Sequence, residues 1–319
     1  MMEVVVRTPA RLHFGFIDMR GDLGRIYCSA GVAVDRPNIV LKARPAERLI
    51  VSGSRAERAR GYAETMLREF NPRGGAEIEV LEDIPEHAGL GSGTQLALAI
   101  GSALSKLYNL GLTVEEIAER LMRGWRSGIG VYAFKGGGFI VDGGHETENP
   151  QGVPPLVFRS EVPEDWIFVI GVPDLDQEMS GRSESQAFRQ IPKPPPELVG
   201  EMARVVLIQM IPSIIKRKIK TFGEAMTTLD FKFGECWASI QGGRFCHPLV
   251  EAGINYLLEE GAHGVGQSSW GPAFYGLVEG EEQAEEVRRK LQRFLEEKGG
   301  GRAFYAKANN CGAEITVKY

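Results

Sequence analysis

A glycine-rich loop that runs directly into an apolar helix pattern is the feature that most constrains this chain. The loop is Gly89-Leu90-Gly91-Ser92-Gly93-Thr94, and apolar residues recur at spacings of three and four from Leu96 onward. Glycines let a loop turn several backbone N–H groups inward, and the helix N-terminus adds about half a positive charge at the same point. The pattern predicts an anion site in which the hydroxyls of Ser92 and Thr94 serve phosphate oxygens or Mg²⁺. A tight turn before a core helix is the alternative interpretation, and the loop alone does not decide between them.

Charge and composition limit the partners. The chain has 319 residues and a formal net charge of -5, with no sustained run of Lys or Arg, which argues against a nucleic-acid partner. Individually placed cations must therefore meet an anionic substrate. The four cysteines are scattered without a metal-binding spacing, which favours free thiols in a reducing cytoplasm. Nowhere do eighteen apolar residues follow one another, so we expect neither a signal peptide nor a membrane span.

Periodicity predicts a mixed chain of strands and helices. Short β-branched segments predict strands, and apolar residues at helical spacing predict helices. The predicted strands are 4–6, 39–43, 49–52, 76–81, 135–144, 166–172, 273–278, 302–308 and 313–319, and the predicted helices are 55–70, 96–107, 114–122, 198–229, 248–259 and 281–297, with Thr113 as a cap. Because strands and helices mix without regular βαβ alternation, the fold class is α+β. A linker near residues 149–160 divides the chain into domains 1–155 and 156–319.

Three segments resemble the motifs of the GHMP kinase superfamily. They are TPARLHFGFIDM near the N-terminus, PEHAGLGSGTQLALA around the glycine loop and SSWGPAFYGLV from Ser268 to Val278. The order and spread of these motifs cover nearly the whole chain. The resemblance implies a two-domain fold, with a ribosomal-protein-S5-like N-terminal domain and a ferredoxin-like α/β sandwich at the C-terminus.

The chain departs from the kinase motifs where the kinases carry their acceptor chemistry. The segment ERLMRGWRSGIG keeps Glu119 at the place of the Mg²⁺-binding glutamate but has Gly130 where the kinases have their aspartate base. Phe16 and Ile17 replace an acid and a histidine, and Gly93 replaces the second serine of the loop. A phosphoryl-transfer enzyme loses much of its rate with its base. The departures indicate a kinase frame with different chemistry.

One branch of the superfamily, the β-ribofuranosylaminobenzene 5′-phosphate synthases of methanopterin biosynthesis, resembles this chain in those departures. TPARLHFGFIDMRGDLGRIYCSAGVAVDRP and SGIGVYAFKGGGFIVDGGH are similar to its signature segments. The resemblance implies that 5-phosphoribosyl diphosphate condenses with 4-hydroxybenzoate or 4-aminobenzoate and releases CO₂ and diphosphate. It also implies Mg²⁺, held by Glu119 and Ser92, and a cytoplasmic homodimer.

The candidate site residues follow from this chemistry. Arg11 and His13 lie two apart on one predicted strand, so they share a face and are expected to offset the substrates' charge together with Arg25. Ser92 and Thr94 are the expected catalytic hydroxyls of the glycine loop, and Ser268 and Ser269 are expected to face the substrate. Surface solvation for each arginine, and a satisfied core position for His13, are the alternatives. Trp270 is expected to close the core or to stack on a benzoate ring.

Two other functions remain open at this point. One is a small-molecule kinase that uses ATP and places its base elsewhere, and the other is an inert nucleotide-binding subunit. The first predicts ATP consumption on addition of an alcohol, and the second predicts ligand binding without turnover.

Overall fold

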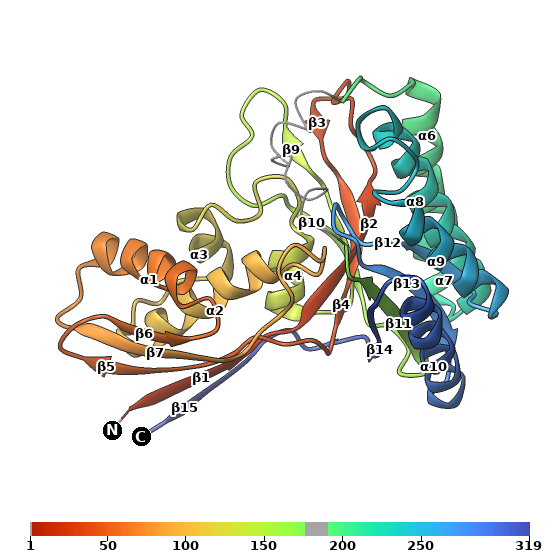
Figure 1. Ribbon diagram of the computed structural model, residues 1–319. Coiled ribbons are helices and arrows are strands. Elements are labelled where there is room, and N and C mark those ends of the chain that lie inside the picture. Colours follow the sequence, from red (N-terminus) through yellow and green to blue (C-terminus); the bar gives the residue numbers. More distant parts are fainter. Residues whose placement is uncertain (1, 176–190) are drawn as a thin grey trace.

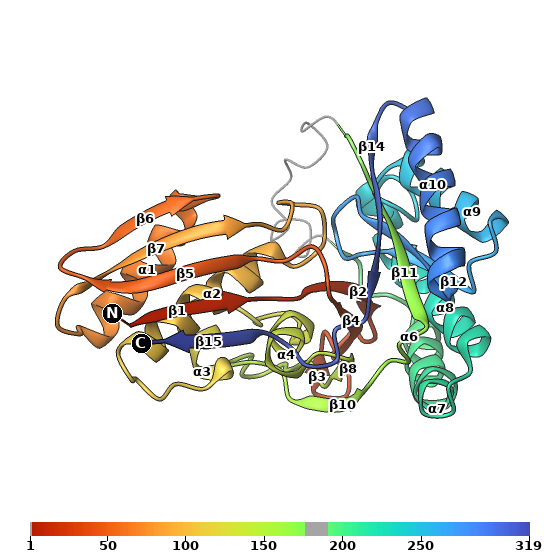
Figure 2. The same cartoon turned by 90° about the horizontal axis from the view of Figure 1, so that it is seen from below.

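The computed structural model describes residues 2–175 and 191–319. A five-stranded sheet with helices on one face forms one end of the molecule (Figure 1). Its strand order is β15 (Glu314–Lys318), β1 (Glu3–Arg7), β5 (Val40–Ala46), β7 (Gly75–Glu82) and β6 (Ile50–Gly53). Figure 2 shows these strands in front of the helices α1 (Ala56–Phe70), α2 (Ser92–Leu107) and α3 (Val114–Arg120). Among the strand pairs of the described residues, β6 and β7 alone are parallel, and helix α1 connects them.

A second sheet lies at the centre of the molecule and supplies one wall of the site. Its order is β10 (Leu156–Ser160), β8 (Phe139–Asp142), β4 (Ser29–Val34) and β2 (Ala10–Phe16). Helix α4 (Ile129–Gly136) packs on β4, β2 and β8. A small ribbon of β3 (Arg25–Ile26) and β9 (His145–Glu146) extends from it. The register of β2 on β4 shifts between His13 and Gly15, which is a β-bulge.

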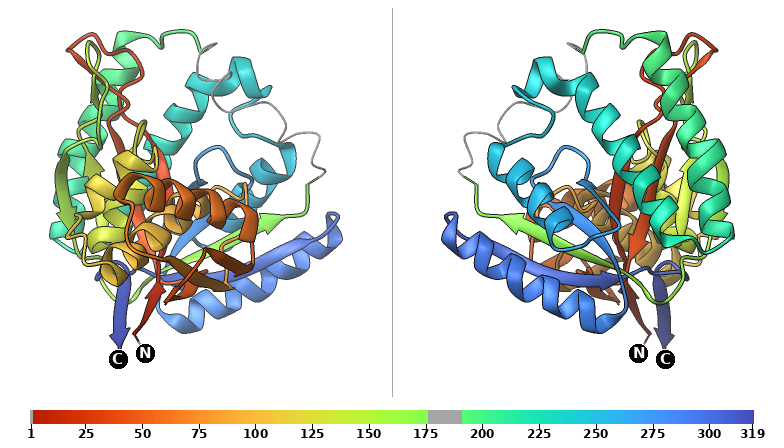
Figure 3. Two further views of the ribbon diagram at one scale, coloured as in Figure 1. Left: turned by 90° about the vertical axis from the view of Figure 1, so that its left-hand side faces the viewer. Right: turned by 90° about the vertical axis from the view of Figure 1, so that its right-hand side faces the viewer.

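The third sheet is sandwiched between helices. Its order is β12 (Gly264–Gln267), β13 (Phe274–Glu279), β11 (Trp166–Pro173) and β14 (Gly301–Lys307). Ile167 and Val169 of β11 face a cluster with α9 (Pro248–Glu259) and α10 (Glu281–Glu297), and Figure 3 shows α10 lying along this sheet. Phe168 and Ile170 point the other way, into the main core that also holds α8 (Ile219–Gln241). Alternation along one strand therefore feeds two cores.

The remaining helical layer exposes several large apolar side chains. Helix α6 (Pro196–Arg204), the π-helix η2 (Val205–Met210) and α7 (Ile211–Ile215) follow one another and pack on α8. Among the described residues, the helical stretch Pro196–Ile215 is long and apolar enough to cross a membrane, by length and composition alone. Its mean hydropathy is 1.6, and 28% of its most apolar 18 residues are buried inside the protein. Leu207 and Ile208 are exposed.

The structure agrees with the predicted α+β class and with most predicted elements, and it differs at particular places. The predicted strand 135–144 begins only at Phe139, because Lys135 and Gly136 end helix α4. Helix α4 buries residues all round, so it carries no amphipathic period that sequence could show. Strand β15 pairs with β1 and β10 pairs with β8, so both extend sheets of the first half of the chain. All four cysteines are free thiols, as predicted.

Candidate active site

A cleft of about 340 Å³ lies where the N-terminus of α2 meets β2, α8 and two loops. Both loops come from segments that the sequence motifs single out. One connects α3 to α4, and the other follows β12. The lining residues are Arg11, His13, Phe16, Thr94, Met122, Arg123, Gly124, Trp125, Arg126, Ser127, Gly130, Phe233, Trp237, Ser269 and Trp270.

The glycine loop reaches this cleft through the first turn of α2. Gly91 is the N-cap, with φ of 83° and no side-chain cap, so no side chain satisfies the first N–H groups of the helix in the usual way. Thr94 lines the cleft, whereas Ser92 is buried and is not among the lining residues. The helix end thus presents a partial positive charge and one hydroxyl to the cleft.

Two side chains from distant segments hold the glycine loop in place. The backbone N–H of Arg11 donates to the carbonyl of Leu90 at 3.1 Å, and the Arg11 guanidinium donates to the carbonyl of Gly89. The hydroxyl of Ser268 donates to the same Gly89 carbonyl at 2.6 Å. Ser268 is fully buried, so it braces the loop from behind the cleft. Arg11 and Ser269 lie at the cleft surface itself.

His13 lies beside Arg11 on β2 and is 3% exposed. The N–H of Gly15 donates to its Nδ1 at 3.2 Å, which places the proton of the neutral ring on Nε2. Nε2 is buried and has no hydrogen-bond partner in the described structure. Burial, and secondly the charge of Arg11, hold the pKa of His13 well below its usual range. His13 is therefore neutral near pH 7 and does not supply the positive charge predicted for it.

A row of aromatic rings starts at His13 and crosses the cleft. The rings of His13 and Phe16 meet edge to face at 4.9 Å between centroids, and Phe16 meets Phe233 at 5.6 Å. The row continues from Phe233 to Trp237 at 5.9 Å and from Trp237 to Trp270 at 4.2 Å. Such a wall suits the faces and edges of a planar ring. Trp270 both lines the cleft and packs against the core; its stacking on a benzoate ring stays a prediction.

Arginines that sequence reasoning missed stand opposite Gly93. A Cβ at Gly93 would lie 2.9 Å from the Arg58 guanidinium and 3.8 Å from that of Arg123. Both guanidinium groups donate to the hydroxyl of Tyr62, at 3.2 Å from Arg58 and 2.9 Å from Arg123. Arg58 also pairs with Glu86, whereas Nε of Arg123 is buried without a partner in the described structure. Gly93, which replaces the second serine of the kinase loop, thus leaves room for the guanidinium groups of Arg58 and Arg123. Their proximity to the loop depends on tertiary structure and could not be predicted from the sequence.

Buried polar groups behind the cleft fix the loop before α4. Asp142 accepts hydrogen bonds from the backbone N–H groups of Gly128 at 2.8 Å, Gly144 at 3.0 Å and Ser29 at 3.2 Å. Burial raises the pKa of Asp142 to about 6, although these hydrogen bonds oppose the shift. His145 Nε2 bonds the carbonyl of Gly124 at 3.0 Å. Asp142 and His145 therefore hold the loop that lines the cleft, although the sequence around them is typical of an ordinary turn.

Two predicted site residues lie away from the cleft. Arg25 donates to the carbonyls of Gly143 and Gly144, at 2.6 and 2.7 Å, and so clasps the turn before β9. Glu119 lies on the exposed face of α3, beside Gly152. The lining set contains no Asp or Glu, and the described residues include no cluster of three His, Cys, Asp or Glu side chains suited to a metal. The arrangement does not fit a metal held by Glu119 and Ser92.

Gly130, which stands where the kinases have their base, faces Thr94. A Cβ at Gly130 would lie 3.1 Å from Cγ2 of Thr94, which is tighter than ordinary van der Waals contact. The amide of Gln95 donates to the Gly130 carbonyl at 2.8 Å and fixes that approach. A side chain at this position would therefore press on Thr94, which would have to shift by a few tenths of an ångström.

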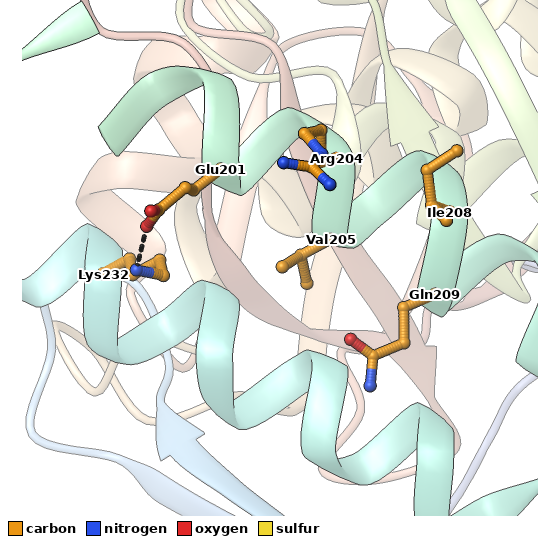
Figure 4. Close-up of a pocket in the computed structure, with 6 residues that line it drawn as sticks. All are labelled: Glu201, Arg204, Val205, Ile208, Gln209 and Lys232. Carbon is orange, nitrogen blue, oxygen red and sulfur yellow. Dashed lines mark hydrogen bonds and ion pairs between the residues drawn. The ribbon is translucent and has the colours of Figure 1, made fainter. Parts of the chain in front are cut away.

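A second hollow of about 290 Å³ lies between α6, η2 and α8 (Figure 4). An ion pair between Glu201 and Lys232 bridges it, and the rest of its lining is Arg204, Val205, Ile208 and Gln209. It shares no lining residue with the cleft at the glycine loop.

Comparison with known proteins places the chain in a family. The family described as GHMP kinases N terminal domain matches residues 57–138, and GHMP kinases C terminal matches residues 210–297. Two archaeal proteins named beta-ribofuranosylphenol 5'-phosphate synthase match nearly end to end. The protein of Archaeoglobus fulgidus is 35% identical, covering 98% of this chain and 99% of its own length, and that of Methanothermobacter thermautotrophicus is 30% identical, covering 98% of each.

Solved structures agree on the fold. A homoserine kinase from Cytophaga hutchinsonii superposes with a TM-score of 0.73 at 16% identity, covering 98% of this chain and 97% of the other. The Methanococcus jannaschii mevalonate kinase superposes with a TM-score of 0.66 at 16% identity, covering 96% of this chain and 98% of the other. Since identity to these kinases is low, they show the fold alone. Sequence identity over the full length decides the branch: the chain belongs to the beta-ribofuranosylphenol 5'-phosphate synthase family, within the GHMP kinase superfamily.

Proposed function

We propose that this chain is a decarboxylating phosphoribosyltransferase that condenses 5-phosphoribosyl diphosphate with 4-hydroxybenzoate. The observation that carries the proposal is the cleft, which joins a cationic helix terminus to an aromatic row and has Gly130 in place of a kinase base. The names of the full-length archaeal relatives support it, because a ribofuranosylphenol carries an oxygen on its ring.

The cationic side of the cleft suits the diphosphate. The α2 N-terminus, the Thr94 hydroxyl and the guanidinium of Arg123 converge there, and Arg58 stands beside Arg123. Charge that builds on the departing diphosphate is stabilised most by donors that are already in place. We assign Thr94 and Arg123 to this role, with Arg11 and Ser268 holding the loop that presents them.

The aromatic side of the cleft suits the benzoate. In the proposed step, the ring carbon that bears the carboxylate bonds to the anomeric carbon as the anomeric C–O bond to diphosphate breaks. The bond between the ring and the carboxylate then breaks, CO₂ leaves, and its electron pair restores the aromatic ring. No oxidant or reductant enters this balance. The protein's part is to orient two anions and to exclude water from the oxocarbenium-like centre.

The finer assignments belong to the same proposal. A diphosphate is itself a Mg²⁺ ligand, so we propose that Mg²⁺ enters with the donor rather than through Glu119. Free thiols support a cytoplasmic location, and the family resemblance supports a homodimer that serves methanopterin biosynthesis.

Carboxyl-labelled 4-hydroxybenzoate tests the proposal. With 5-phosphoribosyl diphosphate and Mg²⁺, and without ATP, we expect labelled CO₂ and diphosphate in equal amounts. ADP formed from ATP on addition of an alcohol, with no CO₂, would show a kinase instead. Binding of the donor without any turnover would show an inert subunit.

A further inference from the structure

His13 lines the cleft at one end of the aromatic row and carries a neutral hydrogen-bond donor. Its Nδ1 is occupied by the N–H of Gly15, and its buried Nε2 has no partner among the described residues. A buried donor left unpaired costs about 1–3 kcal/mol, and most buried polar groups have a hydrogen-bond partner, so an unpaired one calls for an explanation. Because His13 lines the cleft, a bound ligand is the partner that the geometry offers.

The strand is shaped to produce this orientation. The β-bulge between His13 and Gly15 turns the N–H of Gly15 onto Nδ1. Gly15 has a φ of 132°, and a Cβ there would lie 2.9 Å from Cβ of Phe233, so glycine is required at the bulge. Bulges beside active sites commonly redirect a side chain in this way. The local structure thus fixes both the ring and its tautomer.

On the basis of the proposed function, we infer that His13 is the specificity-determining residue for the aromatic substrate, donating from Nε2 to the oxygen opposite the carboxylate. The arginines of the cleft suit anionic groups, whereas the neutral donor at the end of the aromatic row suits a ring oxygen. The low pKa of His13 keeps Nε2 as a single donor across neutral pH.

This contact separates a phenol from an aniline. A phenol oxygen accepts a hydrogen bond in the plane of the ring, and the bond strengthens when the phenol is ionised. The nitrogen of 4-aminobenzoate has its lone pair drawn into the ring and becomes an iminium, a donor only, as the ring attacks. Against it, the Nε2 donor is left unpaired in a buried site. Sites that pair a substrate hydroxyl reject analogues lacking it far better than apolar pockets reject extra bulk.

A pair of substitutions separates recognition from structural support. His13→Asn keeps an acceptor near the position of Nδ1 for the N–H of Gly15 but withdraws the donor from the cleft. His13→Gln does the reverse, because its amide nitrogen reaches the position of Nε2. For wild type, His13→Asn and His13→Gln, kcat/KM is measured with 4-hydroxybenzoate and with 4-aminobenzoate, using CO₂ release. Thermal unfolding by circular dichroism reports the fold of each variant.

We expect His13→Asn to lower the preference for 4-hydroxybenzoate by about tenfold or more while staying folded, and His13→Gln to keep more of it. The reverse order, or an unchanged preference in His13→Asn, overturns the inference. Binding to the wild-type protein, followed by tryptophan fluorescence, adds a test without mutation: 4-hydroxybenzoate should bind at least about tenfold more tightly than 4-aminobenzoate and benzoate, and equal affinities overturn the inference. Wild type that releases CO₂ from neither acid rejects the proposed function instead.

Discussion

At the scale of single residues, Gly130 lies where the kinases have their aspartate base and faces Thr94. We expect Gly130→Asp to gain no phosphorylation of homoserine or mevalonate, because its Cβ would press on Thr94 and no acceptor pocket matches it. CO₂ release should fall, and Gly130→Ala should fall with it, since both add the same Cβ. ATP-dependent phosphorylation by Gly130→Asp would mean that the frame is a kinase with one lesion. The readouts are ADP production and CO₂ release from each variant.

Thr94 is the loop hydroxyl that faces the cleft. We expect Thr94→Ala to lower kcat by roughly tenfold to a thousandfold with little change in KM for the donor, because charge grows on the diphosphate only as it leaves. Thr94→Ser keeps the hydroxyl and should retain most of kcat. Ser92→Ala is the comparison. The sequence predicts a catalytic hydroxyl there too, but Ser92 is 8% exposed and does not line the cleft, so we expect a smaller loss of kcat. Steady-state kinetics with varied donor measure all three, and an unchanged kcat in Thr94→Ala contradicts the assignment.

Arg123 is the cation beside Gly93, and its effect should appear in donor binding. We expect Arg123→Ala to raise KM for 5-phosphoribosyl diphosphate by roughly tenfold to a hundredfold, as for loss of a charged hydrogen bond. Arg68→Ala, an exposed arginine of α1, is the matched loss of charge and should leave KM unchanged. Equal KM values for Arg123→Ala and Arg68→Ala would remove Arg123 from the donor site.

At the scale of elements, Asp142 ties the N-terminus of α4 to β4 and β8, and its titration should be visible in stability. The folded-state pKa is raised, from 3.8 to about 6, so the proton is bound more tightly in the folded protein. The tighter proton binding adds about 3 kcal/mol to the free energy of unfolding below about pH 4. That stabilisation is lost as the pH rises through about 6.

The change to compare is Asp142→Asn, which cannot titrate. Between pH 4.5 and pH 7 we expect the urea midpoint of wild type to fall relative to that of Asp142→Asn, because the wild-type carboxyl loses its bound proton over this range and the amide has none to lose. The gap between the two proteins should therefore change by up to about 3 kcal/mol in free energy of unfolding. Glu64→Gln, an exposed carboxylate of α1, controls for the loss of a charge. A gap that stays constant with pH contradicts the raised pKa.

Local signals explain which elements could be predicted from the sequence. Thr113 does cap α3, with Glu116 completing a capping box, because both residues act within one turn. The bulge in β2 was not predictable, since it depends on the register against β4. The same holds for the site: a motif located the glycine loop, but the places of Arg25 and Arg123 depend on which distant backbone each side chain reaches.

At the scale of the whole molecule, the first and last strands of the chain pair with each other. Strand β15 pairs with β1 from Glu3 opposite Lys318 to Arg7 opposite Glu314, and the two termini lie side by side (Figure 1). On the way, Val34 bridges Ala308 between the central sheet and the segment after β14. A division at residue 155 would therefore leave the first sheet without an edge strand that packs against its core. Pairings across three hundred residues leave no local mark in sequence.

Removal of residues 313–319 tests this pairing. Ile315 and Val317 pack half-buried against the core, so their loss with the strand's hydrogen bonds should cost about 3 kcal/mol. For a protein of 319 residues, that lowers Tm by roughly 4–5 °C. The cleft residues on β2, α2 and α8 stay in place, so kcat/KM at 25 °C should remain within about twofold of wild type. Removal of Tyr319 alone is the control, because its side chain is 94% exposed and its loss should not change Tm. If the longer truncation unfolds at the wild-type temperature by circular dichroism, β15 contributes nothing to the first sheet, and the N-terminal half of the chain is sufficient for that sheet without it.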